Sequence, residues 1–240
     1  MTRPSGDVVT VPTDAGPMPA RRWLPPTGRG PALLLLQEIF GVSRYIQRRG
    51  ADLAEAGYVV LAPELYWRLD ATPIDESQPG AIEAAMGRAQ QLDWETTVQD
   101  AVAALHHLKG RAEVSGGTGV IGFCFGGGLA FNVAAVEEVD ALVSYYGSAL
   151  PGLLGLAPQV TAPSLHHFGT ADDYLDAQTV AGIRAAVTSG AAPVEFETYE
   201  GANHAFDNDV FVMHHPQASK LAWQRTLTFL ARELPRQTLT

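Results

Sequence analysis

Short apolar runs alternate along the chain with longer stretches of mixed character. Runs in the middle of the chain, such as Ala32–Leu36 and Gly119–Phe123, are apolar at nearly every position. Strands that are covered on both faces show this pattern, and its order along the chain is typical of a mostly parallel sheet with helices on both sides. We therefore predict an α/β fold with about eight strands, at Asp7–Val11, Ala20–Leu24, Ala32–Leu36, Tyr58–Ala62, Gly119–Phe123, Asp140–Tyr145, Ser164–Phe168 and Val194–Tyr199.

The longer stretches predict five helices. Asp93 is a good N-cap for one of them, and Lys109 and Gly110 are suited to its other end. The first two strands are less apolar and are expected to form an antiparallel hairpin at the sheet edge. Pro12 and Pro25 leave the exact ends of these two strands undetermined. The expected helices are Arg44–Ala56, Asp93–Leu108, Gly127–Ala135, Leu175–Ser189 and Gln217–Glu233.

The segment Tyr66–Gln91 interrupts this alternation. It holds two prolines and shows little strong periodicity before Ala81. We interpret it as an excursion near the carboxyl edge of the sheet that could cover a site. The chain has 240 residues and no internal repeat or linker, so we expect one domain over residues 1–240.

Composition narrows the partners of the protein. The formal net charge of −10 disfavours nucleic acid and anionic membranes, which need clustered Lys and Arg. The single cysteine excludes an intrachain disulfide and a Cys-rich metal site. No secretory signal is visible before Met18, and the longest aliphatic run, Ala32–Leu36, is too short to cross a bilayer. These features predict a soluble cytoplasmic protein, a monomer or small homo-oligomer, without cofactor or metal.

The segment Gly119–Gly128 carries the strongest chemical signal. It reads G-x-C-x-G at Gly122, Cys124 and Gly126, between an apolar strand and a helix rich in small residues. This is the nucleophile-elbow pattern, in which a sharp strand-to-helix turn presents the nucleophile and needs small neighbours. The start of the helix also offers amides and a positive dipole end to an anion. The alternative is that Cys124 is a buried structural thiol.

Two further groups follow the nucleophile in the order acid, then base. Asp172 and Asp173 follow the strand Ser164–Phe168, and His204 lies in a glycine-led loop after Val194–Tyr199. Ligands of open α/β sheets bind at these carboxyl ends of strands. The residues themselves do not decide between the two aspartates, and either could instead cap the next helix. The other six histidines form three adjacent pairs without further ligands at metal spacing.

These motifs together resemble the dienelactone hydrolase (carboxymethylenebutenolidase) family. The resemblance implies that Cys124 is the nucleophile, His204 the general base and Asp172 the residue that orients the imidazole. It also implies that Glu38 lies beside the cysteine and takes part in its activation, and that the amides of Ile39 and Phe125 form the oxyanion hole. The matching segments are Gln37–Gly41, Ala62–Tyr66, Gly122–Gly127, Tyr145–Gly147, Gly169–Asp172 and Gly201–Phe206.

One position departs from the resembled family. Members that act on the anionic dienelactone carry an arginine four residues after the histidine, whereas this chain has Asn208 between Asp207 and Asp209. Two acids and an amide there are expected to repel a carboxylate, so a neutral lactone or ester is as good a candidate as the dienelactone. Candidate substrate-binding residues are Arg68, Arg88, Tyr145 and Phe206.

The predicted function is therefore hydrolysis of a small-molecule lactone or ester by a cysteine nucleophile through an acyl-enzyme. Two alternatives stay open. The first is a hydrolase of another activated ester, thioester or amide. The second is a non-catalytic scaffold of the α/β-hydrolase fold that binds a small apolar ligand. A scaffold of this kind usually lacks a member of the triad, and here all three positions are filled.

Overall fold

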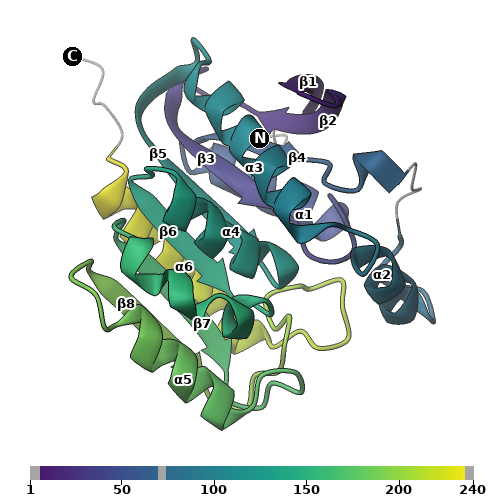
Figure 1. The fold of residues 1–240 in the computed structure, drawn as a ribbon, viewed down its shortest axis with the longest axis vertical. Coiled ribbons are helices and arrows are strands. Elements are labelled where there is room, and N and C mark those ends of the chain that lie inside the picture. The colour runs from purple at the N-terminus through teal and green to yellow at the C-terminus, as the bar shows by residue number, and fades with distance from the viewer. Residues whose placement is uncertain (1–5, 70–73, 236–240) are drawn as a thin grey trace.

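The computed structural model describes residues 6–69 and 74–235, whose strands form one eight-stranded sheet in the order β1-β2-β4-β3-β5-β6-β7-β8 (Figure 1). The last six strands in that order run parallel, and β1 and β2 are antiparallel at one edge. The predicted α/β fold is confirmed. The strands are β1 Asp7–Thr13, β2 Gly16–Trp23, β3 Gly30–Leu36, β4 Val59–Pro63, β5 Val114–Phe123, β6 Ala141–Tyr145, β7 Ser164–Gly169 and β8 Val194–Tyr199.

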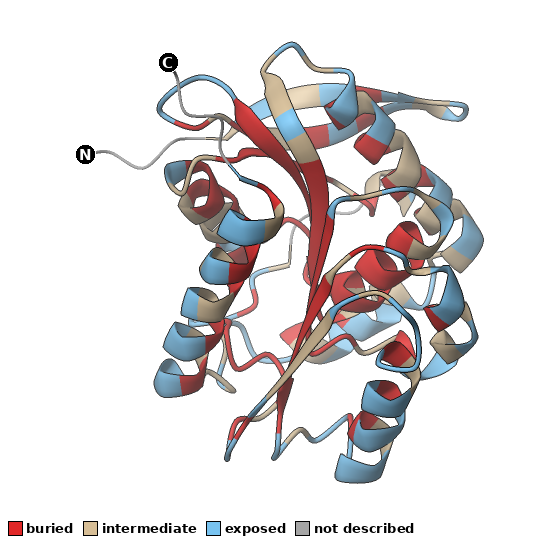
Figure 2. Cartoon of the chain, turned by 90° about the vertical axis from the view of Figure 1, so that its left-hand side faces the viewer, coloured by how far each residue is buried: buried red, intermediate tan, exposed pale blue. Residues whose placement is uncertain are grey.

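Helices cover both faces of this sheet. Residues of α1 and α6 join one hydrophobic cluster with the sheet, and residues of α3, α4 and α5 join a second cluster on the other face. Figure 2 shows the buried strands between the two helical layers, whose outer sides are exposed. The helices are α1 Arg44–Glu55, α2 Ala81–Ala89, α3 Trp94–Lys109, α4 Phe125–Val136, α5 Ala177–Val187 and α6 Pro216–Glu233, with 3-10 turns at Trp67–Leu69, Leu150–Gly152 and Leu154–Gln159.

Strand β3 shows why the middle runs are apolar throughout. All seven of its residues are buried. Leu33 and Leu35 belong to the cluster with α1 and α6, while Leu34 and Leu36 belong to the cluster with α3 and α4. Successive side chains of a strand point to opposite faces, so a strand between two helical layers needs an apolar residue at every position.

The edge hairpin and the helix boundaries follow from local chemistry. Pro12 lies inside β1, which pairs only with β2, and an edge strand can accommodate a residue without an amide hydrogen. The helix predicted from Leu175 begins instead at Ala177, because the carboxylate of Asp176 accepts the amide of Thr179 at 2.7 Å. Among the described residues, no helix combines the length and the apolar character that crossing a bilayer requires.

Candidate active site

The carboxyl ends of four parallel strands bring the candidate residues together. Glu38 follows β3, Cys124 follows β5, Asp172 follows β7 and His204 follows β8. Glu38, Cys124 and His204 line one cavity of about 130 Å³. The other lining residues are mostly apolar: Ile39, Phe40, Ile82, Met86, Ser148, Tyr174, Ala205, Phe211 and Met213.

Cys124 occupies a strained turn between β5 and α4. Its backbone has φ 53° and ψ −115°, a conformation that a residue with a side chain rarely adopts. A Cβ added to Gly122 would lie 1.9 Å from the carbonyl oxygen of Gly126, and one added to Gly126 would lie 2.3 Å from that of Leu36. The two glycines of G-x-C-x-G are therefore required by backbone contacts. The motif indeed forms the sharp turn that the sequence predicted.

Two amides next to the thiol are available to an oxyanion. Those of Ile39 and Phe125 donate no hydrogen bond to any residue that the structure describes, and Phe125 is the first residue of α4. The loop that holds Ile39 is fixed from both sides. The Tyr66 hydroxyl donates to the Ile39 carbonyl at 2.7 Å, and the Gly41 amide donates to the Glu38 carbonyl at 3.1 Å. Unpaired amides at a helix start suit developing negative charge.

His204 contacts the first of the two adjacent aspartates. Its Nδ1 lies 2.8 Å from Oδ2 of Asp172, while Oδ1 of Asp172 accepts the amides of Tyr174 and Leu175. Asp172 therefore organises the turn before α5 as well as the imidazole. Asp173 turns away to Asn203, whose amide group donates to its carboxylate at 2.6 Å.

The imidazole of His204 lies between Asp172 and the thiol. Burial alone would lower its pKa, but the negative charge of Cys124 and the hydrogen bonds to Asp172 and Cys124 outweigh that effect and raise the pKa to about 10. The arrangement therefore favours a proton on the imidazole whenever the thiol is ionised. Cys124 Sγ also lies 3.7 Å from the Ser148 hydroxyl.

Glu38 is a buried carboxyl group held only by neutral donors. It is 1% exposed, and its two oxygens accept from the Tyr146 hydroxyl at 3.1 Å and the Asn208 side-chain amide at 2.8 Å. Burial, together with the charge of Glu76, raises its pKa to about 8 despite the opposing hydrogen bonds from Asn208 and Tyr146. At neutral pH the protonated form of Glu38 is therefore favoured.

The structure gives Asn208 and its neighbours a different place from the one expected. Asn208 is fully buried against Glu38, so its side chain does not present itself to a substrate. Asp207 is paired with Arg49 through two hydrogen bonds of 2.8 and 2.7 Å, and Asp209 is paired with Arg48. Asp207 and Asp209 were expected to repel a substrate carboxylate. That expectation is wrong, because each aspartate is paired with an arginine that neutralises its charge.

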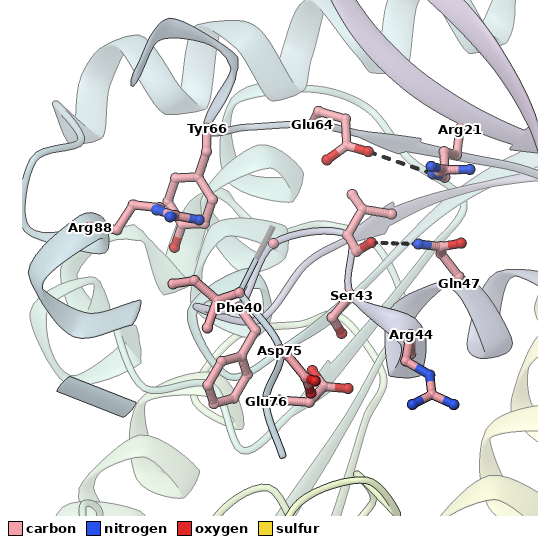
Figure 3. Close-up of a pocket in the computed structure, with 13 residues that line it drawn as sticks. Arg21, Phe40, Ser43, Arg44, Gln47, Glu64, Tyr66, Asp75, Glu76 and Arg88 are labelled. Atoms are coloured by element: carbon pink, nitrogen blue, oxygen red, sulfur yellow. Dashed lines mark hydrogen bonds and ion pairs between the residues drawn. The ribbon is translucent and has the colours of Figure 1, made fainter. Parts of the chain in front are cut away.

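The two predicted arginines lie outside this cavity. Arg68 donates to Asp100 of α3 at 2.7 and 3.0 Å, and the two line a different cavity. Arg88 lies over the ring of Tyr66, with its guanidinium carbon 5.6 Å from the ring centroid. Both Arg88 and Tyr66 line a neighbouring cavity of about 290 Å³, shown in Figure 3. The two cavities share Phe40.

The two aromatic candidates, Tyr145 and Phe206, lie in the protein core behind the residues that line the cavity. Both are fully buried and do not line the cavity. The Tyr145 hydroxyl bonds to Thr226 at 2.6 Å, and its carbonyl accepts the Cys124 amide at 3.0 Å. The ring of Phe206 packs edge-on against Tyr146. Their contacts therefore position the residues around the thiol.

Sequence reasoning missed several lining residues. Ser148 follows β6, which lies beside β5, so the position of its strand could have indicated it. Tyr174 packs edge-on against His204 with ring centroids 5.1 Å apart. Ile82 and Met86 come from α2, in the segment interpreted as a cover. Within the described ranges, no three His, Cys, Asp or Glu side chains are grouped to hold a metal ion.

Comparisons with known proteins identify the family and the fold of this chain. The model of the dienelactone hydrolase family matches residues 18–234. A carboxymethylenebutenolidase of Pseudomonas sp. is 35% identical over 216 residues, which cover 88% of this chain and 89% of that protein. Two solved structures share the fold at 20% identity, and each match covers 97% of this chain and 100% of the other. They are a dienelactone hydrolase-like promiscuous phosphotriesterase from metagenomic libraries, with a TM-score of 0.81, and a dienelactone hydrolase from Anabaena variabilis, with a TM-score of 0.72.

Proposed function

Because the chain belongs to the dienelactone hydrolase family, we propose that it hydrolyses a lactone or ester through an acyl-enzyme formed on the Cys124 thiol. Membership confirms the predicted family and places the protein among hydrolases of the lactone and ester class. The nucleophile, the roles of the other residues and the treatment of residues 1–240 as one catalytic domain are parts of the proposal.

One observation carries it: the thiol on the strained turn shares a cavity with His204, which is bonded to Asp172 at 2.8 Å. A structural thiol does not need a turn with φ 53°, which costs about 1–3 kcal/mol in conformational strain. A base held by a third group is the arrangement that activates a nucleophile. The same geometry argues against a scaffold that merely binds a ligand.

The first half of the reaction would acylate the enzyme. His204 takes the thiol proton, and the sulfur of Cys124 attacks the carbonyl carbon of the ester. The amides of Ile39 and Phe125 would bind the resulting oxyanion. When the carbonyl re-forms, the bond to the leaving oxygen breaks, and the imidazolium of His204 gives its proton to that oxygen. The products are a thioester on Cys124 and an alcohol, which stays attached when the substrate is a lactone.

The second half would restore the thiol. Water attacks the thioester while His204 accepts one of its protons, and the same two amides bind the second oxyanion. The C–S bond then breaks, the sulfur is reprotonated from His204, and the acid product leaves. Asp172 holds the imidazole in the orientation that both transfers need. Glu38, beside the thiol, would take part in setting when the sulfur is charged.

Rapid mixing with p-nitrophenyl acetate tests the acyl-enzyme. We expect a burst of p-nitrophenol in proportion to the enzyme, followed by slower turnover, because a thioester must be hydrolysed before the next cycle. Acid quenching during the burst should give an acetylated protein, with the acetyl group on the peptide that carries Cys124. An acetyl group on another residue, or a burst that persists after full alkylation of the single cysteine, would contradict the proposal.

Substitution of the two aspartates separates their roles. We expect Asp172→Asn to lower kcat by about 10²- to 10⁴-fold, because the amide no longer fixes the imidazole tautomer. Asp173→Asn keeps the contact to Asn203 possible and should change kcat by less than about threefold. Steady-state hydrolysis of a chromogenic ester measures both. Equal losses in the two variants would show that the acid has been assigned to the wrong residue.

A further inference from the structure

The cavity at Cys124 is lined by few charged side chains among the residues that the structure describes. None of the described residues that line it is Lys or Arg. Its ionisable members are Glu38, Cys124, His204 and Tyr174, and all the others except Ser148 are apolar. A cavity of this composition can desolvate an uncharged group readily, but it has no fixed positive side chain to receive a carboxylate.

Several arginines on neighbouring segments of the chain either pair with an aspartate or line another cavity. Arg49 is bound to Asp207, Arg48 to Asp209 and Arg68 to Asp100. Arg44 and Arg88 line the neighbouring cavity, and Arg88 lies over Tyr66 (Figure 3). Among the described lining residues, His204 alone can carry a positive charge, and that charge pairs with Asp172 and the Cys124 sulfur.

The mouth of the cavity is apolar and bordered by acids. Met86 and Tyr174, which line the cavity, are 42% and 51% exposed and so reach its opening. The carboxylates of Asp173 and Glu83 lie close enough to act electrostatically on the Tyr174 hydroxyl, whereas the side chain of Asp172 is buried and paired with His204. These carboxylates therefore repel an anionic substrate at the mouth, whereas a neutral apolar substrate can pack against Met86 and Tyr174.

The volume limits the group that the cavity encloses. At about 130 Å³ it is close to a protein cavity of about 150 Å³ that binds benzene. A short acyl chain or one small ring therefore fills it. From the lining, the mouth and the size together, we infer that this site takes uncharged lactones or esters with a small apolar acyl group and discriminates against substrates with a carboxylate on that group. The inference rests on the proposed function.

Alkylation of Cys124 measures the charge preference without any turnover. Iodoacetamide and iodoacetate differ in charge but deliver groups of nearly the same size, and the single cysteine makes the readout unambiguous. We expect the rate ratio of amide to acetate at Cys124 to exceed the ratio for 2-mercaptoethanol by about 10-fold or more, because the cavity does not compensate a buried carboxylate. Equal ratios would overturn the inference.

Hydrolysis provides the second measurement. p-Nitrophenyl butyrate and mono-p-nitrophenyl succinate have acyl groups of similar length, and only the second carries a carboxylate. We expect kcat/KM for the butyrate to be higher by about 10²-fold. Comparable values, both dependent on Cys124, would overturn the inference and leave the proposed function intact. If Cys124→Ala still hydrolyses the butyrate ester, the proposed function is overturned instead. The alkylation ratios of the wild-type protein would still test the charge preference of the cavity.

A cation placed in the cavity should weaken the preference. Ile82 lines it from α2, and we expect Ile82→Arg to lower both the alkylation ratio and the butyrate-to-succinate ratio by about 10-fold. Ile82→Gln controls for the loss of the apolar side chain. Gln90→Arg adds the same charge at the exposed end of the same helix and should leave both ratios within about twofold. Equal effects of the arginine at positions 82 and 90 would contradict a local charge preference.

Discussion

Cys124→Ala is expected to lower kcat/KM for ester and lactone hydrolysis by at least about 10⁴-fold, because it removes the nucleophile and leaves only binding and the oxyanion amides. Alanine retains the Cβ and meets the same backbone strain at φ 53°, so the substitution deletes one sulfur atom and little else. The residue is 8% exposed, and the lost contacts should cost about 1–2 kcal/mol of stability. Steady-state kinetics and denaturant unfolding measure the two effects separately.

Ser148→Ala is the matched control. Its hydroxyl lies 3.7 Å from Sγ of Cys124 and lines the same cavity, but the proposed mechanism gives it no covalent role. We expect a loss of less than about 10-fold, as for one neutral hydrogen bond. The nucleophile assignment fails if Cys124→Ala retains more than about a tenth of the activity, or if Ser148→Ala loses as much as Cys124→Ala.

Local pattern was sufficient to predict the sheet and the turn of Cys124. Because β3 is buried on both faces, all its positions are apolar, and this pattern can be recognised in the sequence. The close backbone contacts at Gly122 and Gly126 leave no room for a residue with a side chain. The order of strands also places Glu38 and Cys124 together, because β3 and β5 are neighbours in the sheet. These features depend on contacts near in sequence or on the general rules of parallel sheets.

The rest of the site depends on where side chains point after folding. Asn208 meets Glu38 across 170 positions of the chain, and no spacing pattern relates the two. Asp172 and Asp173 are adjacent, so only the turn before α5 decides which carboxylate reaches His204. Arg88 is only two residues from Met86, which lines the cavity, yet its guanidinium lies over Tyr66 and Arg88 lines another cavity. Such directions are set by packing and are not visible in residue types.

Glu38→Gln is expected to stabilise the folded protein, and increasingly so as the pH rises. The carboxyl group has a pKa near 4.5 when unfolded and about 8 when folded, so folding favours its protonated form. Below pH 4.5 the group is protonated in both states and carries no penalty. Between pH 4.5 and 8 the unfolded state gains by ionising, by about 1.4 kcal/mol per pH unit. At pH 7 the substitution should therefore add on the order of 3 kcal/mol.

Glutamine also fits the hydrogen bonds of the neutral acid. Tyr45 donates to Asp207 at 2.5 Å, and its oxygen lies 3.4 Å from the Tyr146 hydroxyl. When Glu38 is ionised, Tyr146 donates to it, and neither tyrosine has a proton for the contact between them. A protonated acid or a glutamine at position 38 can donate to Tyr146, which then donates to Tyr45. The chain of donors is complete only with the neutral group.

Unfolding in urea at pH 5 and pH 8 measures the effect, with Glu55→Gln as an exposed control on α1. We expect the stability difference between variant and wild type to grow over that range at position 38 and to stay within about 0.5 kcal/mol at position 55. A variant that is equally destabilised at both pH values would contradict a raised pKa. If Glu38→Gln gains stability but loses activity, the buried acid is a functional group that the fold accommodates at its own expense, as is common where catalysis needs an unfavourable environment. Stability gained without loss of activity would instead remove Glu38 from the proposed chemistry.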